Sequence, residues 1–120
     1  MATGTVYVPH EPEFHAFTSL PTGISAYPTG APNGYYLFPD GKVRVEINVS
    51  GLTSNQTNTL ITGFSYAPTE VNAYANGFLG SDGQSVGASK GGQIQVTKSG
   101  NINVFSTSQY GIGLWIEFYP

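Results

Sequence analysis

The sequence GYYLFPDGKVRVEINV, residues 34–49, contains two strands and the turn that joins them. In its second half, residues 42–49, apolar and polar residues alternate strictly, which predicts a strand with one buried and one exposed face. Pro39 has a preset φ and Gly41 can adopt a positive φ, so the intervening FPDGK predicts a hairpin turn. The apolar residues expected to face the core from this hairpin are Val43, Val45, Ile47 and Val49.

Three further segments show the same alternation: QIQV at 93–96, NINVF at 101–105 and GLWIEFY at 113–119. The KSGN sequence predicts a turn between the first two, and GSDGQ at 80–84 predicts another loop. Short strands separated by turns, with no helical periodicity, predict an all-β chain that forms an antiparallel sandwich or barrel. The core residues expected from these segments are Ile94, Val96, Ile102, Val104, Leu114, Ile116 and Phe118.

The length of 120 residues predicts a single domain with one core, and no internal repeat is visible. The segment 9–33 contains five prolines, which are uncommon inside central strands. We therefore expect residues 1–33 to form an irregular or edge-lying arm and residues 34–120 to form the barrel.

The composition narrows the classes of partner. Charged residues make up 9% of the chain, against roughly 25% in soluble globular domains. The formal net charge of −3 disfavours nucleic acid and anionic membranes, because both attract basic surfaces. We expect neither a membrane helix nor a signal peptide, because no apolar run is long enough and the basic start is missing. The absence of cysteine excludes disulfides and thiolate metal sites, which fits folding in a reducing cytosol.

The sequence HEPEFHAF contains both histidines of the chain, His10 and His15. A zinc-protease helix needs two histidines four positions apart, whereas these are five apart and Pro12 would break the helix. In an extended chain, Glu11 and Glu13 share one side with His15, and His10 points to the other. We therefore interpret the segment as the polar face of an edge strand, and expect no metal site and no cofactor.

Catalytic motifs are weak in this chain. Glycoside hydrolysis needs two acids across a cleft, and Glu46 and Glu117 are predicted to project from exposed strand faces. Short strands in so small a chain seldom enclose a deep cleft. The G-x-S-x-G motif of a serine nucleophile is also missing. We therefore predict that the protein is not an enzyme.

Two polar strand faces carry residues suited to binding. In the last strand, Trp115, Glu117 and Tyr119 alternate with the expected core residues. Three interpretations of this face are open: stacking on a sugar ring, burial against a second subunit, or packing inside one sandwich. The second face lies in VNAYANGF and consists of Asn72, Tyr74 and Asn76. Amides with tyrosine are typical of neutral-saccharide recognition, and also of any polar strand.

Four segments follow one another in the order GKVRVEINVSGLTS, LITGFSYAPTEV, GGQIQVTKSGNINVF and GLWIEFYP. In this order they resemble the C-terminal head domain of receptor-binding proteins of tailed phages, such as phages of lactococci and related Gram-positive bacteria. The second segment supplies the hydrophobic, aromatic and proline residues of the family pattern, here Phe64, Tyr66 and Pro68. The resemblance covers residues 34–120. Longer members of the family carry an N-terminal shoulder and a neck, and we expect neither within these 120 residues.

The resemblance implies a Greek-key barrel of about six to seven strands, assembled as a homotrimer, that binds host cell-wall saccharide and other tail or baseplate proteins. It also implies a place in the phage virion, after synthesis in the host cytoplasm. Saccharide sites of the family commonly use Trp, His, Asp and Arg, for which this chain offers Trp115, His15, Asp40 and Arg44. The full set of candidate ligand-binding residues is Trp115, Glu117, Asp40, Arg44, His15, Asn72 and Tyr74.

We therefore expect a non-enzymatic receptor-binding head of a phage tail that recognises host cell-surface saccharide. One alternative is a trimeric structural adaptor or capsid-decoration domain that binds another virion protein. Another is a small cell-wall glycan hydrolase that uses Glu46 or Glu117. Neither nucleic acid nor a membrane is expected as a partner.

Overall fold

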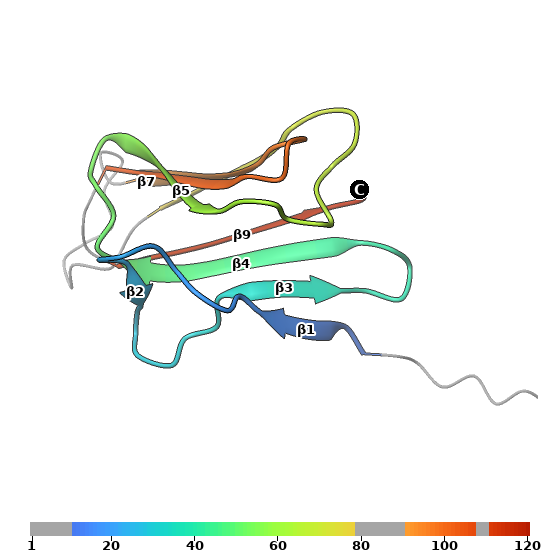
Figure 1. Cartoon of the computed structure of the whole chain (residues 1–120), viewed down its shortest axis with the longest axis horizontal. Helices are drawn as coiled ribbons and strands as arrows, with labels where there is room; N and C mark the ends of the chain where they lie inside the picture. Colours follow the sequence, from blue (N-terminus) through green and yellow to red (C-terminus); the bar gives the residue numbers. More distant parts are fainter. Residues whose placement is uncertain (1–10, 79–90, 108–110) are drawn as a thin grey trace, which may run out of the picture.

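The computed structural model describes residues 11–78, 91–107 and 111–120, and every regular element in these ranges is a β-strand (Figure 1). The strands are β1 (Glu13–Ala16), β2 (Ser25–Ala26), β3 (Gly34–Leu37), β4 (Val43–Ser50), β5 (Gln56–Ile61), β6 (Ala73–Phe78), β7 (Gly91–Val96), β8 (Ile102–Ser106) and β9 (Ile112–Phe118). The predicted all-β class is confirmed. Within the described ranges there is no helix that could span a membrane.

The strands form two antiparallel sheets. In sheet A, β4 pairs with β3 on one side and with β9 on the other, and β3 in turn pairs with β1. The short β2 pairs with the end of β4 beyond β3. In sheet B, the strand order is β5-β8-β7-β6. The hairpins predicted across FPDGK and KSGN are confirmed as β3–β4 and β7–β8, and Gly41 and Gly100 have positive φ.

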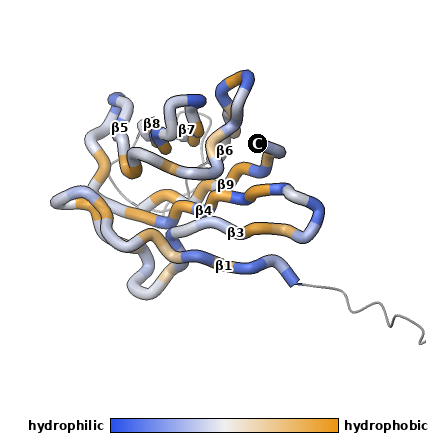
Figure 2. The backbone as a smooth tube through the Cα atoms, turned by 45° about the vertical axis from the view of Figure 1, so that its right-hand side comes forward, coloured by the Kyte–Doolittle hydropathy of each residue, from blue (hydrophilic) through white to orange (hydrophobic). Residues whose placement is uncertain are grey.

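The core lies between the two sheets. Figure 2 shows hydrophobic positions of β4 and β9 in the middle of the molecule, whereas the hydrophilic β1 lies at the far edge of sheet A. In β4, Val45, Ile47 and Val49 are fully buried, and the residues between them are partly exposed. The core residues predicted from the sequence are all buried except Phe118, which lies at the end of β9 and is half-buried.

Residues 1–33, predicted as an arm outside the barrel, contribute β1 and β2 to sheet A. β1 is an edge strand, as that prediction allows, and sheet A begins before residue 34. No hydrogen-bonded ladder joins sheet A to sheet B in the described ranges, so these strands form two sheets and not a closed barrel. The loop predicted at 80–84 lies outside the described residues.

One side chain takes the place of a strand partner beside β4. β3 pairs with β4 as far as Glu46 and β2 pairs from Val49, so Asn48 lies at the gap between them. Asn48 N–H donates to Asn33 Oδ1 at 2.7 Å, and Asn33 Nδ2 donates to the Asn48 carbonyl at 2.9 Å. The N–H of Tyr27 also donates to that carbonyl at 3.0 Å. The Asn48 carbonyl therefore has a second donor, whereas the acceptor of the Asn48 N–H is Asn33 Oδ1.

Asn33→Ala should lower the free energy of unfolding by about 1–3 kcal/mol, because it leaves the partly buried Asn48 N–H without its acceptor. Asn33→Asp keeps an acceptor oxygen and should cost less. Equilibrium unfolding in urea measures both differences. Equal unfolding free energies for the wild type and Asn33→Ala would show that the junction between β3 and β2 does not need this side chain.

Candidate binding face

The outer face of sheet A, which points away from the core, carries aromatic and charged side chains from β1, β3, β4 and β9. In antiparallel sheets, residues paired across strands place their side chains on the same face. One such row consists of Phe14, Tyr36, Arg44 and Glu117, and the next consists of Ala16, Gly34, Glu46 and Trp115. We define the aromatic face as the side chains of Phe14, Tyr36, Arg44, Glu46, Trp115 and Glu117.

Arg44 lies at the centre of the aromatic face. Its Cζ atom is 4.4 Å from the ring centroid of Trp115 and 6.0 Å from that of Tyr36, within the range of cation–π contacts. Its terminal nitrogens are 3.6 Å from Glu117 and 3.8 Å from Glu46, longer than the roughly 2.7–2.9 Å of a charge-assisted hydrogen bond. Arg44 Nε is buried and has no hydrogen-bond partner in the described part of the chain. The guanidinium therefore stacks on Trp115 and lies near two carboxylates, without a close hydrogen bond to either of them.

Trp115 is 53% exposed and Tyr119 is 63% exposed. Neither residue packs between the sheets, so the interpretation of this strand face as a second packed layer inside the sandwich is wrong. Arg44 covers one face of the Trp115 ring, so the exposed surface belongs to the opposite face and the edge. The Trp115 ring, held on one face by Arg44, can therefore stack against an apolar surface of a ligand or partner. Stacking on sugar and burial against a second subunit both fit this geometry.

A groove of about 470 Å³ runs beside Trp115, between β9 and β6. These strands are the outer strands of their sheets on this side, and no ladder joins them within the described residues. Trp115 and Glu117 line the groove from β9, and Tyr74, which is 55% exposed, lines it from β6. Gln95 Nε2 donates to the Tyr74 hydroxyl at 2.8 Å and holds that ring in place. The groove thus brings an indole, a carboxylate and a phenol together.

The seven candidate residues divide into two groups. The first group consists of Trp115 and three residues around it, Glu117, Arg44 and Tyr74. The other three residues, His15, Asn72 and Asp40, lie elsewhere. His15 lies on the opposite side of sheet A, where its ring stacks on Tyr35 at 5.1 Å and its Nε2 is 2.6 Å from Glu13. This contact confirms that His15 and Glu13 share a side, while His10 is outside the described residues.

Asn72 also lies away from the groove. Its Oδ1 accepts a hydrogen bond from the Lys98 N–H at 2.9 Å, so it joins the start of β6 to the β7–β8 turn.

Asp40 lies in the β3–β4 turn, where both of its carboxylate oxygens have partners. The Tyr119 hydroxyl donates to Oδ2 at 2.6 Å, and the Lys42 N–H donates to Oδ1 at 3.1 Å. The hydrogen bond from Tyr119, and then that from Lys42, holds the pKa of Asp40 below its ordinary value. The hydrogen bond between Tyr119 and Asp40 also raises the pKa of the Tyr119 hydroxyl. Asp40 therefore connects the turn to the residue after β9 and lies outside the groove.

Tyr119→Phe should raise the pKa of Asp40 toward its ordinary value, because it removes the main hydrogen bond to the charged carboxylate. Since the folded pKa is the lower one, Asp40 stabilises the native state above its unfolded pKa, and this contribution disappears as the pH falls through the folded value. An NMR titration of the side-chain carboxyl carbons measures the shift, and Asp40→Asn identifies the signal. An unchanged titration midpoint in Tyr119→Phe would contradict the assigned hydrogen bond.

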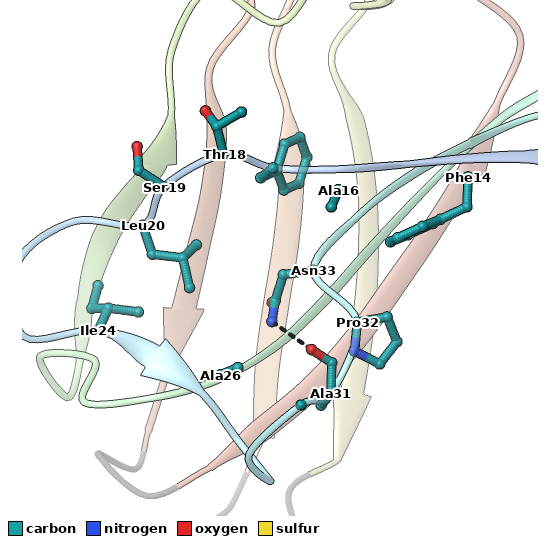
Figure 3. A pocket seen from close by; sticks show the side chains of 12 residues that line it. Phe14, Ala16, Thr18, Ser19, Leu20, Ile24, Ala26, Ala31, Pro32 and Asn33 are labelled. Carbon is teal, nitrogen blue, oxygen red and sulfur yellow. Dashed lines mark hydrogen bonds between the residues drawn. The ribbon is translucent and has the colours of Figure 1, made fainter.

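A second hollow, of about 590 Å³, lies between β1 and the segments around β2 (Figure 3). Figure 3 shows Leu20 and Ile24 on one side of it, and Phe14 and Pro32 on the other. The side-chain amide of Asn33, the one such amide in its lining, donates to the backbone carbonyls of Ala31 and Asn48. Its lining has the hydroxyls of Thr18 and Ser19 but no charged side chain and no tryptophan, whereas the groove combines an exposed indole with a carboxylate and a phenol. The groove beside Trp115 is therefore the better candidate site.

Phe14 and Tyr36 belong to the aromatic face although the sequence reasoning did not select them. The signal for Tyr36 was present, because a hairpin that pairs Leu37 with Val43 must place Tyr36 opposite Arg44. Phe14 follows from the pairing of β1, since its ring packs on Tyr36 at 4.8 Å between centroids. Gly34 allows this position, because a Cβ there would lie 2.8 Å from Phe14 Cζ.

Comparison of the chain with protein-family models, with curated proteins and with solved structures found no match. In the described ranges, no group of three or more His, Asp or Glu side chains is placed to hold a metal ion. The function therefore has to be inferred from the side chains around the groove.

Proposed function

We propose that the protein is a non-enzymatic receptor-binding head of a phage tail, which recognises host cell-surface saccharide at the groove beside Trp115. The proposal rests on one observation: the Trp115 ring is held on one face by Arg44 at 4.4 Å and is more than half exposed. A sugar ring has an apolar C–H face that can stack on an indole. Stacking of nucleic-acid bases on aromatic side chains, worth ~1–3 kcal/mol per ring, gives the scale of such a contact.

The polar groups around Trp115 fit the hydroxyls of a sugar. Glu117 lies beside Trp115 in the groove, and Tyr74 lies across the groove from both. Glu46 is the cross-strand partner of Trp115 in β4. Carboxylates accept hydrogen bonds from hydroxyls, and a phenol both donates and accepts. An apolar platform with a few placed polar groups is the usual composition of a small-ligand site.

The assignment to a phage tail rests on the order of the four sequence segments. The resemblance also implies a Greek key, and the strand order of sheet B agrees with that expected fold. β6, β7 and β8 are consecutive neighbours, and β5 lies beside β8. This order is that of a Greek key. The proposed head is part of the virion, is made in the host cytoplasm and contacts other tail or baseplate proteins.

We also propose that the head is a homotrimer. Large hydrophobic or aromatic side chains are exposed at several places in the described ranges, including Tyr27, Val71 and Tyr119. Exposed apolar patches mark interfaces between proteins. With 4 basic and 7 acidic residues in the chain, ion pairs are few, so the subunit contacts are hydrophobic.

Light scattering coupled to gel filtration should give a mass three times the 12.7 kDa of the chain. The mass should not change when the salt concentration is raised, because hydrophobic contacts are not screened as ion pairs are. A monomeric mass at micromolar concentration, or dissociation in high salt, would contradict this assembly.

Trp115→Ala should reduce binding to Gram-positive cell-wall polysaccharide by roughly ten- to hundredfold, because the stacking platform is lost. Its melting temperature and assembled mass should stay close to those of the wild type, since Trp115 lies outside the core. Trp115→Phe, which keeps a smaller ring, should bind with intermediate affinity. Isothermal titration calorimetry and gel filtration on the same samples measure these quantities.

Other outcomes of these measurements point to other functions. Full affinity in Trp115→Ala would remove Trp115 from the site, and loss of assembly would place it between subunits. Binding to another virion protein without binding to cell walls would favour the structural adaptor. Release of reducing ends from the polysaccharide, abolished in Glu46→Gln or Glu117→Gln, would show a hydrolase.

A further inference from the structure

The outer face of sheet B carries a row of hydrogen-bonded side chains that crosses all of its strands. Thr59 Oγ1 on β5 donates to Asn103 Oδ1 on β8 at 2.8 Å, and Asn103 Nδ2 donates to Gln95 Oε1 on β7 at 2.9 Å. Gln95 Nε2 donates to the Tyr74 hydroxyl on β6 at 2.8 Å. We call Thr59, Asn103, Gln95 and Tyr74 the polar row. Its members position one another, so they form an ordered surface of amides and hydroxyls.

The strands under the polar row contain no charged residue. β5, β6, β7 and β8 have the sequences QTNTLI, AYANGF, GGQIQV and INVFS. All charged residues in the described strands belong to sheet A. Solvated sheet faces normally carry charges, which keep proteins soluble and protect sheets from pairing with other chains. The outer face of sheet B, which has no charged strand residue, is therefore suited to an uncharged partner.

The polar row continues from the groove. Tyr74 is the end of the row and also lines the groove opposite Trp115. Since strands in a sheet lie about 4.8 Å apart, the four strands of sheet B add about 14 Å to the groove. This length is that of several linked sugar rings. One sugar ring would occupy only the platform at Trp115.

The charges beside Trp115 are balanced. Arg44 lies near Glu46 and Glu117, and Lys42 Nζ is 3.4 Å from Glu117. Each of these two cations therefore has an acidic neighbour, and no excess of positive charge is present to attract a phosphate or a uronic acid. The groove and the polar row both suit a neutral ligand that is rich in hydroxyl groups.

We infer that the site is extended and takes a neutral, linear oligosaccharide, which stacks on Trp115, crosses the groove and lies along the polar row of sheet B. This inference rests on the proposed function and specifies its ligand. Amides and hydroxyls both donate and accept hydrogen bonds, as sugar hydroxyls do. A protein partner suits the row less well, because the centres of protein interfaces are enriched in aromatic and apolar residues.

The test compares neutral oligosaccharides of increasing length, from the monosaccharide to the hexasaccharide, in the glucose and N-acetylglucosamine series. Affinity for wild-type protein, measured by calorimetry or by NMR titration for the weakest ligands, should rise with length. Asn103→Ala and Thr59→Ala should lose roughly two- to tenfold in affinity for the longest ligand, which is the effect of one hydrogen bond. Their affinity for the monosaccharide should equal that of the wild type.

Gln56→Ala is the matched control. Gln56 is an exposed residue on β5 with a side-chain amide. It lies three positions before Thr59, and because side chains alternate along a strand, the two side chains point to opposite faces. Its removal should change affinity for no ligand in the series. Melting temperatures and assembled masses of all variants show that they remain folded and associated.

The possible results separate the two proposals. If wild-type protein binds none of these sugars and no cell-wall polysaccharide, both proposals are contradicted. If it binds with an affinity that does not depend on length, or if Asn103→Ala loses no affinity for the longest ligand, only the extended site is contradicted. A change of assembled mass in Asn103→Ala would show that sheet B packs against a second copy, and would also contradict the extended site. Tighter binding of a phosphorylated or uronic-acid polymer would contradict the neutral ligand.

Discussion

The alternation of β4 is the constraint on which the rest of the structure depends. β4 pairs with β3 on one edge and with β9 on the other, so its two faces set the faces of sheet A. Its apolar residues are buried and the intervening residues are partly exposed. A shift by one residue would bury Arg44 and Glu46 and expose the valines. Burying such charges without full hydrogen bonding costs several kcal/mol, so the core and the outer face are specified together.

The aromatic face follows from this arrangement. β9 is paired with β4 over its whole length, and this register puts Trp115 opposite Glu46 and Glu117 opposite Arg44. Arg44, a neighbour on the same face of the sheet, then stacks on the indole. The indole is thus held in an exposed position by a cation that the core strand itself fixes. The open side between β9 and β6 adds a groove, because these two edge strands are not joined by a ladder in the described residues.

The sequence predicted most of the core and part of the candidate site. Period-two alternation identified the buried faces of β4, β7, β8 and β9, because each side chain on one face contacts the same layer. It also placed Trp115 and Glu117 on an outer face. Alternation cannot tell which strands become neighbours across the sandwich, so the meeting of Tyr74 with Trp115 was not predictable. The same limit applies to Asp40 and His15, whose residue types suited a sugar site but which contact Tyr119 and Tyr35 from other strands or their ends.

The most direct test of the central claim uses the fluorescence of Trp115, because it is the one tryptophan of the chain. In the free, assembled protein the emission should be that of a solvent-exposed indole, and added cell-wall polysaccharide should shift it to shorter wavelength in a saturable way. The midpoint should match the affinity from calorimetry. Emission of a buried indole in the free protein would place Trp115 in a subunit contact. Binding by calorimetry without any change in emission would contradict the claim that the sugar stacks on Trp115.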